Sequence, residues 1–174
     1  MGIQFETDYN METLTAMAKS LRKTVRKKRS RRVHIFAAVV LILGLLTILA
    51  TTAGGEPLGA SGVVTLLAML VVILVSLFED KLNAWFARKR LLPGTEHAAA
   101  TFEEDGYVSA TGVTESRFSY AQIVAVAETA RYFVFALSSH HTQAYDKRTI
   151  RGGSVEDFRA FIAEKTGKLV EKIK

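Results

Sequence analysis

The chain has 174 residues, of which 23 are Lys or Arg, 17 are Asp or Glu and none is cysteine, which excludes disulfide frameworks, thiolate zinc sites and cysteine nucleophiles. The net charge of +6 belongs to the first half, because residues 1–93 carry 13 basic and 6 acidic side chains whereas residues 94–174 carry 10 and 11. The near-neutral second half has no basic stripe for phosphates, so we expect no nucleic-acid partner.

The first predicted elements are a strand and a basic juxtamembrane helix within residues 1–32. Residues 3–6 alternate apolar and polar side chains, which is typical of a strand, and we expect them to pair with the later soluble part. Thr7 or Asp8 is placed to cap a helix. Apolar residues then recur at helical spacing, at Leu14, Met17, Ala18, Leu21 and Val25. We expect this helix to continue toward the apolar run that follows it.

Residues 33–52 are predicted as the first transmembrane helix. The run has 20 residues without Asp, Glu, Lys or Arg, and at about 1.5 Å per residue it covers about 30 Å, the thickness of the hydrocarbon core. Twelve of its residues are Val, Ile, Leu or Phe, which together contribute on the order of −4 to −7 kcal/mol to insertion. The run is too long for the apolar core of a signal peptide, and its leader is partly acidic.

Residues 63–82 are predicted as the second transmembrane helix. Their fully apolar part, 63–78, has only 16 residues, and a buried core helix is the alternative for a run this short. The Gly- and Pro-rich residues 53–62 predict a tight extracytoplasmic turn between the two helices. Residues 83–96 are predicted as a linker, in which Trp85 suits the aromatic belt of a membrane interface.

Basic side chains predict the orientation of these helices. Nine Lys or Arg precede the first run, four follow the second, and none lies between them. Positive charge inside therefore predicts both termini in the cytoplasm, with the chain in the cytoplasmic (inner) membrane. We expect part of the basic run to contact anionic lipid head groups; the alternative is that its charges only set the topology. The residues expected at the membrane surface are Arg26, Lys27, Lys28, Arg29, Arg31 and Arg32.

Residues 97–166 are predicted as a cytoplasmic domain. Apolar alternation and turn residues predict strands at 98–102, 107–111, 117–120, 123–126, 132–137 and 142–145. Ser154 and Asp157 then form a capping pair for a final amphipathic helix, and residues 167–174 follow as a basic tail. This order predicts an α+β fold: a two-helix transmembrane hairpin with a C-terminal antiparallel β-barrel or sheet capped by one α-helix. It is similar to the order of pleckstrin-homology-like (PH-like) barrels.

We predict no catalytic, cofactor-binding or metal-binding residue. His140 and His141 are adjacent but have too few further ligands close in sequence for a metal site. The sequence has no Gly-x-Ser-x-Gly and no phosphate-binding Gly-rich loop, which argues against an enzyme. Between Ile35 and Phe78 it has no ionisable residue apart from Glu56 in the turn, which argues against an ion pathway.

Lys147, Arg148 and Arg151 form the compact basic group of the soluble half. We expect this group to contact the membrane surface or an acidic partner, and the alternative is a solvated turn. The first hairpin turn of the domain, residues 103–106, is acidic and would repel anionic head groups.

Several short motifs occur along the chain in a defined order. They are Ile3, Phe5, Glu6, Thr7 and Tyr9, then Phe102 to Gly106, Glu115-Ser116, Tyr120 to Ile123, Glu128-Thr129, Phe133, Lys147-Arg148 and Glu156 to Phe161. Together with the two apolar runs, this order resembles the YcxB-like family of bacterial membrane proteins over most of the chain. The family often has Pro before the Lys-Arg pair, where this chain has Asp146. The resemblance implies a PH-like fold beside the membrane and brings no established activity.

These features favour a membrane-anchored protein-binding or scaffold module, whose open strand edge receives a partner segment. The expected partners are the lipid bilayer and either a partner protein or further copies of the chain. Two alternatives stay open at this point: an oligomeric permeation component, and an accessory subunit of a membrane enzyme complex.

Overall fold

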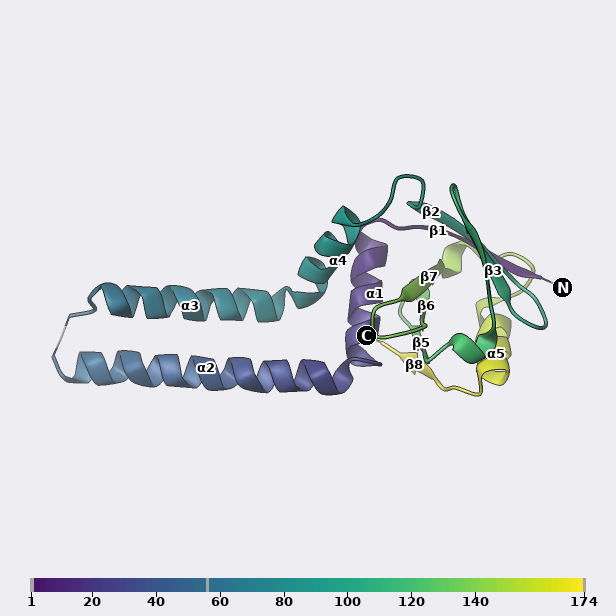
Figure 1. The fold of residues 1–174 in the computed structure, drawn as a ribbon. Helices are drawn as coiled ribbons and strands as arrows, with labels where there is room; N and C mark the ends of the chain where they lie inside the picture. The colour runs from purple at the N-terminus through teal and green to yellow at the C-terminus, as the bar shows by residue number, and fades with distance from the viewer. Residues whose placement is uncertain (1, 56, 174) are drawn as a thin grey trace.

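Two long helices project from one side of a folded domain in the computed structural model, which describes residues 2–55 and 57–173 (Figure 1). The first half of the chain forms β1 (Ile3–Asp8), α1 (Met11–Lys23), α2 (Lys27–Ala53), α3 (Ala60–Leu77) and α4 (Glu79–Lys89). The second half forms β2 (His97–Phe102), β3 (Tyr107–Thr111), β4 (Glu115–Phe118), η1 (Tyr120–Gln122), β5 (Ala125–Glu128), β6 (Tyr132–Ala136), β7 (Thr142–Asp146), η2 (Lys147–Thr149), α5 (Val155–Thr166) and β8 (Val170–Lys172). The projecting pair is α2 and α3, and α1 stands across its base.

The domain consists of two four-stranded sheets. One sheet has the order β1-β2-β3-β4, and the other has the order β7-β6-β5-β8. All pairings are antiparallel except β5 with β8, which is parallel. The predicted α+β class is confirmed, and the two sheets with one long helix after them are compatible with a PH-like barrel.

The helical hairpin is an insertion between two neighbouring strands of one sheet. β1 pairs with β2 along its whole length, from Ile3 opposite Phe102 to Asp8 opposite His97. Everything from residue 9 to residue 96 therefore leaves the sheet at the end of β1 and returns at the start of β2. The predicted pairing of the N-terminal strand with the later domain is confirmed.

Aromatic side chains fill the space between the sheets. Phe5 of β1 lies 4.7 Å from Phe158 of α5, measured between ring centroids, and Phe102 of β2 lies 4.8 Å from the same ring. All three side chains are fully buried. Because Phe158 sits where both sheets and α5 meet, its truncation to Ala would cost about 3–5 kcal/mol. The core thus holds β1 in place although the hairpin separates it from the rest of the domain.

α1 packs on the outer face of the second sheet. Tyr132 and Val134 of β6 point away from the aromatic core and contact Ala16 and Met17 of α1. Asn10 caps the helix by accepting hydrogen bonds from two backbone amides of its first turn. β6 is consequently buried on both faces, which explains its uninterrupted apolar sequence.

Both helical connections to the hairpin bend sharply at the same level. α1 ends at Lys23 and α2 begins at Lys27, so the expected continuous helix is broken between them. At the break, the Arg26 guanidinium donates to the Ser139 carbonyl oxygen of the β6–β7 loop over 2.6 Å. On the other side α3 ends at Leu77 and α4 follows after Phe78, whereas the expected second span continued to residue 82.

α2 and α3 are long and apolar enough to cross a membrane, and neither apolar stretch is buried inside the protein. They extend about 40 Å and about 27 Å at 1.5 Å per residue. Each threonine of the pair donates its hydroxyl to a carbonyl one turn earlier in its own helix, as Thr47 does to Leu43 and Thr65 to Ser61. Such bonds satisfy polar side chains where water is lacking.

The C-terminal end departs from the expected tail. The predicted capping pair of Ser154 and Asp157 is present at the start of α5, and Gly167 ends the helix in the left-handed conformation. The chain then turns back, and β8 pairs in parallel with β5, with Val126 opposite Val170. β8 is three residues long and has a polar sequence, so periodicity alone does not reveal it.

Candidate functional site at the mouth of the barrel

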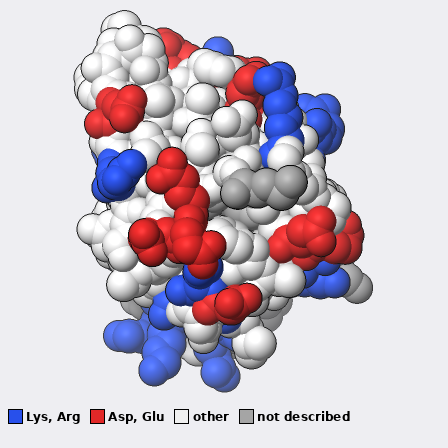
Figure 2. All heavy atoms as spheres, turned by 90° about the vertical axis from the view of Figure 1, so that its right-hand side faces the viewer, with Lys and Arg blue, Asp and Glu red and all other residues white. Residues whose placement is uncertain are grey.

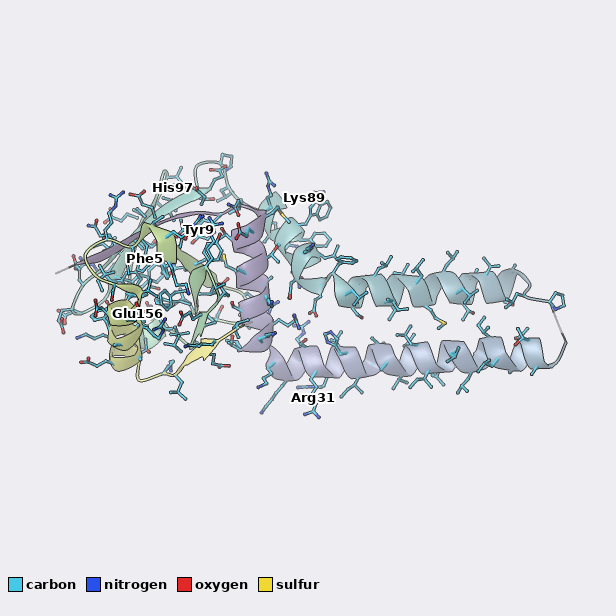
Figure 3. The ribbon with its side chains drawn as sticks, turned by 180° about the vertical axis from the view of Figure 1, so that it is seen from behind. Phe5, Tyr9, Arg31, Lys89, His97 and Glu156 are labelled. Atoms are coloured by element: carbon cyan, nitrogen blue, oxygen red, sulfur yellow. The ribbon has the colours of Figure 1, made fainter. Side chains whose placement is uncertain are left out.

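A cavity of about 290 Å³ opens between the two sheets at the end that faces the hairpin. Its wall comes from both sheets, from α1 and from the segment that leads into β2. The residues that line it are Tyr9, Leu14, Met17, Leu91, Thr95, Ala98, Ser109, Thr111, Thr114, Ser116, Phe118, His141, Thr142 and Gln143. Figure 3 shows Tyr9 beside α1 and Phe5 deeper among the side chains of the domain.

The cavity exists because inward-facing side chains become small along each strand. On β2 the inward positions pass from Phe102 to two alanines, Ala100 and Ala98. The register places Ala100 opposite Ser109 on β3, and Ser109 opposite Ser116 on β4. Three adjacent strands therefore present small side chains at the same height, which leaves a space that aromatic residues fill elsewhere in the barrel.

Hydroxyl groups without protein partners line this space. Ser109, Ser116 and Thr142 have no side-chain hydrogen bond among the residues that the structure describes, and their hydroxyls are open to the cavity. Gln143 is held at the back, where its Oε1 accepts hydrogen bonds of 2.7 Å from the phenols of Tyr107 and Tyr145. Burial raises the pKa of both phenols, so they stay neutral donors at physiological pH.

The lining carries no Asp, Glu, Lys or Arg within the described part of the chain. A ligand in this cavity would consequently be held by neutral hydrogen bonds and by contacts with the apolar residues of α1. The wall also includes β4, which pairs with β3 on one side only. The site is therefore a hollow without Asp, Glu, Lys or Arg in its described lining, beside a free strand edge, which is an arrangement that receives extended peptide segments.

Lys147, Arg148 and Arg151 are engaged in separate ion pairs. The Lys147 ammonium lies 3.0 Å from Glu128 Oε1, and the Arg148 guanidinium bonds to Asp146 over 2.9 Å. Arg151 lies 3.5 Å from a carboxylate oxygen of Glu6 and bridges the backbone of Gln4. This end of β1 points away from the hairpin (Figure 1). The face seen from there mixes acidic and basic side chains (Figure 2), and the expected contact of this group stays a prediction.

The pKa of Glu128 is strongly lowered in the folded domain. It accepts two hydrogen bonds from Arg159, of 2.7 and 2.8 Å, and one of 3.0 Å from Lys147. Hydrogen bonding to Arg159, and then to Lys147, lowers the pKa of this buried carboxyl from 4.5 to about 2. The group connects β5, η2 and α5 and lies outside the cavity, so its role is to hold the barrel together.

The basic juxtamembrane residues are distributed around α2 and its start. Arg26 turns back to the domain, where it also donates to Nδ1 of His140 over 2.9 Å. Arg31 is exposed beside the start of α2 (Figure 3), and Lys28, Arg29 and Arg32 are exposed as well. Their contact with lipid stays a prediction. In residues 2–55 and 57–173, no three His, Asp or Glu side chains come together as metal ligands would.

The two-sheet domain is closed by a helix and carries an apolar helical hairpin between its first two strands, which defines an α+β protein. Two of its helices are long and apolar enough to cross a membrane. Residues 102–162, from the end of β2 into α5, match the family model described as YcxB-like protein. The match confirms the resemblance to the YcxB-like family for residues 102–162, and the motif at residues 3–9 lies outside it. Nothing matches the chain among curated proteins or among solved structures.

Proposed function

We propose that the chain is an integral protein of the bacterial cytoplasmic membrane whose YcxB-like domain binds an extended segment of a partner protein at the cytoplasmic surface. The hairpin fixes the domain to the bilayer and sets its orientation. The barrel mouth and the free edge of β4 form the binding site. The protein performs no chemistry in this proposal and acts as a scaffold.

The pairing of β1 with β2 is the observation that best supports anchoring of the domain to the membrane by the hairpin. Strands that share a hydrogen-bonded ladder must lie in the same compartment, so both ends of the inserted hairpin meet the membrane from one side. An exposed apolar segment of two helices satisfies this requirement, whereas a single span would separate the strands. The 13 basic residues that flank the helices, with none in the turn, favour the cytoplasm as that side.

The binding mode follows from the geometry beside β4. A partner strand added to this edge would satisfy its free backbone groups, and alternate side chains of that strand would point toward the hollow. Unpartnered hydroxyls at Ser109 and Ser116 favour a small polar side chain there over a charged one.

The topology is testable by cysteine labelling, because the native chain has no cysteine. In intact cells, a membrane-impermeant maleimide is expected to label Leu58→Cys in the turn and to leave Glu104→Cys and Ser139→Cys unlabelled. Permeabilised cells are expected to label all three variants. Labelling of the two domain positions in intact cells would overturn the proposed orientation.

The binding site is testable with a photoreactive amino acid at Ser116 in the full-length chain. We expect a crosslinked partner polypeptide at Ser116 and none at Glu164, an exposed position on α5 that serves as the matched control. Adducts of equal yield at both positions, or none at Ser116, would contradict a site at β4. An adduct that contains only a second copy of this chain would favour the oligomeric alternative, which flux measurements in liposomes would then examine.

A further inference from the structure

Helix α4 presents a row of apolar side chains on one side of its axis. On its other side α4 packs against α1, and Ala84 is fully buried there. Phe78, Leu82, Trp85 and Phe86 follow one another at helical spacing, so they form one continuous face. Each of these four residues is 37–51% exposed. A contiguous group of exposed apolar and aromatic side chains marks an interaction surface, and we call this group the α4 face.

The start of α4 lies level with the start of the apolar run in α2. Nε2 of His34 in α2 is 3.8 Å from a carboxylate oxygen of Glu79, the first residue of α4. His34 is the second residue of the apolar run 33–52, and the basic residues 27–32 precede that run in the same helix. α4 leaves α3 toward the domain, as does the basic start of α2 (Figure 1). The two segments therefore share the layer between the apolar helices and the domain.

The length of α3 places the α4 face at the same boundary. α3 has 18 residues, which extend about 27 Å at 1.5 Å per residue, close to the hydrocarbon thickness of about 30 Å. Phe78 therefore follows directly where a crossing by α3 ends. The chain then bends away from the axis of α3 (Figure 1). A straight continuation would carry the α4 face out into water, whereas the bend keeps it near the end of the hydrocarbon core.

Positive charge borders the α4 face. The Lys89 ammonium lies 3.6 Å from the centroid of a Trp85 ring, and the Lys81 ammonium lies 5.8 Å from that of Phe78. The acidic side chains of the first turn are paired with Arg22 of α1. Aromatic rings sit at head-group level in membranes, and lysines beside them reach anionic head groups. The apolar rings alone would also suit a protein partner, but their level and their basic border favour the bilayer surface.

We propose that α4 is an interfacial helix whose α4 face is immersed in the head-group region of the bilayer that α2 and α3 cross. The proposal rests on the proposed anchoring of the chain and goes beyond it, because a third segment then contacts lipid and fixes the domain against the surface. Leu91 comes just after the end of α4 and lines the cavity at the barrel mouth. The immersed helix therefore leads directly into the wall of the proposed binding site.

The test uses the native fluorescence of the full-length protein in phosphatidylcholine nanodiscs, because Trp85 is the single tryptophan of the chain. We expect lipids with a spin label near the head group to quench Trp85 more strongly than lipids labelled near the acyl-chain ends, and aqueous iodide to quench it weakly. The control Trp85→Phe/Leu169→Trp moves the tryptophan to an exposed apolar position of the domain. There we expect strong quenching by iodide and none by the labelled lipids.

Two results for Trp85 would overturn the proposal. Quenching by iodide without quenching by lipid would place the α4 face in water. Weak quenching by both reagents would show that protein covers it, such as a second copy of the chain. The variant Trp85→Phe/Leu46→Trp separates this proposal from the anchoring. Lipid quenching at Leu46→Trp but not at Trp85 would reject the interfacial helix alone, whereas no lipid quenching at either position would reject the anchoring as well.

Discussion

Arg22 of α1 and Asp80 of α4 form a bidentate ion pair across 58 positions of sequence, with nitrogen–oxygen distances of 2.7 and 2.6 Å. The pair joins the two bends through which the chain enters and leaves the hairpin. Both side chains are three-quarters or more buried. Hydrogen bonding to Asp80 raises the pKa of Arg22, so the guanidinium stays protonated.

We expect Arg22→Ala to lower the free energy of unfolding by about 1–3 kcal/mol, since it leaves the largely buried Asp80 carboxylate without its main partner. The double variant Arg22→Asp/Asp80→Arg is expected to recover part of that loss, because it restores opposite charges at the two bends. Denaturant unfolding of the full chain in a neutral detergent measures both values. A double variant no more stable than Arg22→Ala would mean that the pair does not couple α1 to α4.

Acid is expected to destabilise the barrel through Glu128. Its pKa is about 2 in the folded protein and 4.5 without its partners, so the unfolded state binds more protons between these values. The stabilisation is fully present above pH 4.5 and is lost as the pH falls toward 2, by about 1–3 kcal/mol in total. The free energy of unfolding measured against pH checks this. Glu128→Gln is expected to be less stable at pH 7, and its free energy of unfolding is expected to fall less between pH 4.5 and pH 2.

All five tyrosines resist ionisation in the folded protein. Burial raises the pKa of Tyr9, Tyr107, Tyr120, Tyr132 and Tyr145 above 10. The folded state therefore disfavours tyrosinate, and its stability is expected to fall as the pH rises above 10. An absorbance titration in detergent is expected to show tyrosinate only together with loss of tertiary structure. Ionisation of one tyrosine near pH 10 with the fold intact would show that its phenol is accessible to solvent in the folded protein.

Substitutions of two small polar residues of α1, Ser20 and Thr13, are expected to change the free energy of unfolding in different ways. The Ser20 hydroxyl is buried without a hydrogen-bond partner among the described residues, so Ser20→Ala is expected to be neutral or to stabilise by up to about 1 kcal/mol. Thr13 donates to the Asp8 carbonyl oxygen over 2.6 Å and lies 3.1 Å from the Tyr132 hydroxyl. Thr13→Val removes these bonds and is expected to cost about 1–3 kcal/mol. Thermal unfolding of both variants provides the comparison.

The elements with strong local patterns were predictable. Alternation and turn residues gave β2 to β7 within a few positions, and the pair of Ser154 and Asp157 gave the start of α5. The break after Lys23 was not predictable, because apolar spacing continues through Val25, and the contact of Arg26 with Ser139 at the break joins segments far apart in sequence. β8 has too few and too polar residues to be recognised without its partner β5.

The candidate site at the barrel mouth depends on relationships that one sequence does not encode locally. The barrel mouth appears only when the register aligns Ala100, Ser109 and Ser116 across three strands. Small residues at the inward positions of neighbouring strands are the sequence signal that could have predicted this cavity.

The account depends most on β1 pairing with β2 while the hairpin lies in the membrane. Glu6 and Ala99 are exposed and directly opposite each other in that pairing, at a separation that a disulfide can bridge. In native membranes, Glu6→Cys/Ala99→Cys is expected to form an intramolecular disulfide under mild oxidation, whereas Glu6→Cys/Glu164→Cys is not. A first pair that stays reduced, with its two cysteines labelled from opposite sides of the membrane, would contradict the account.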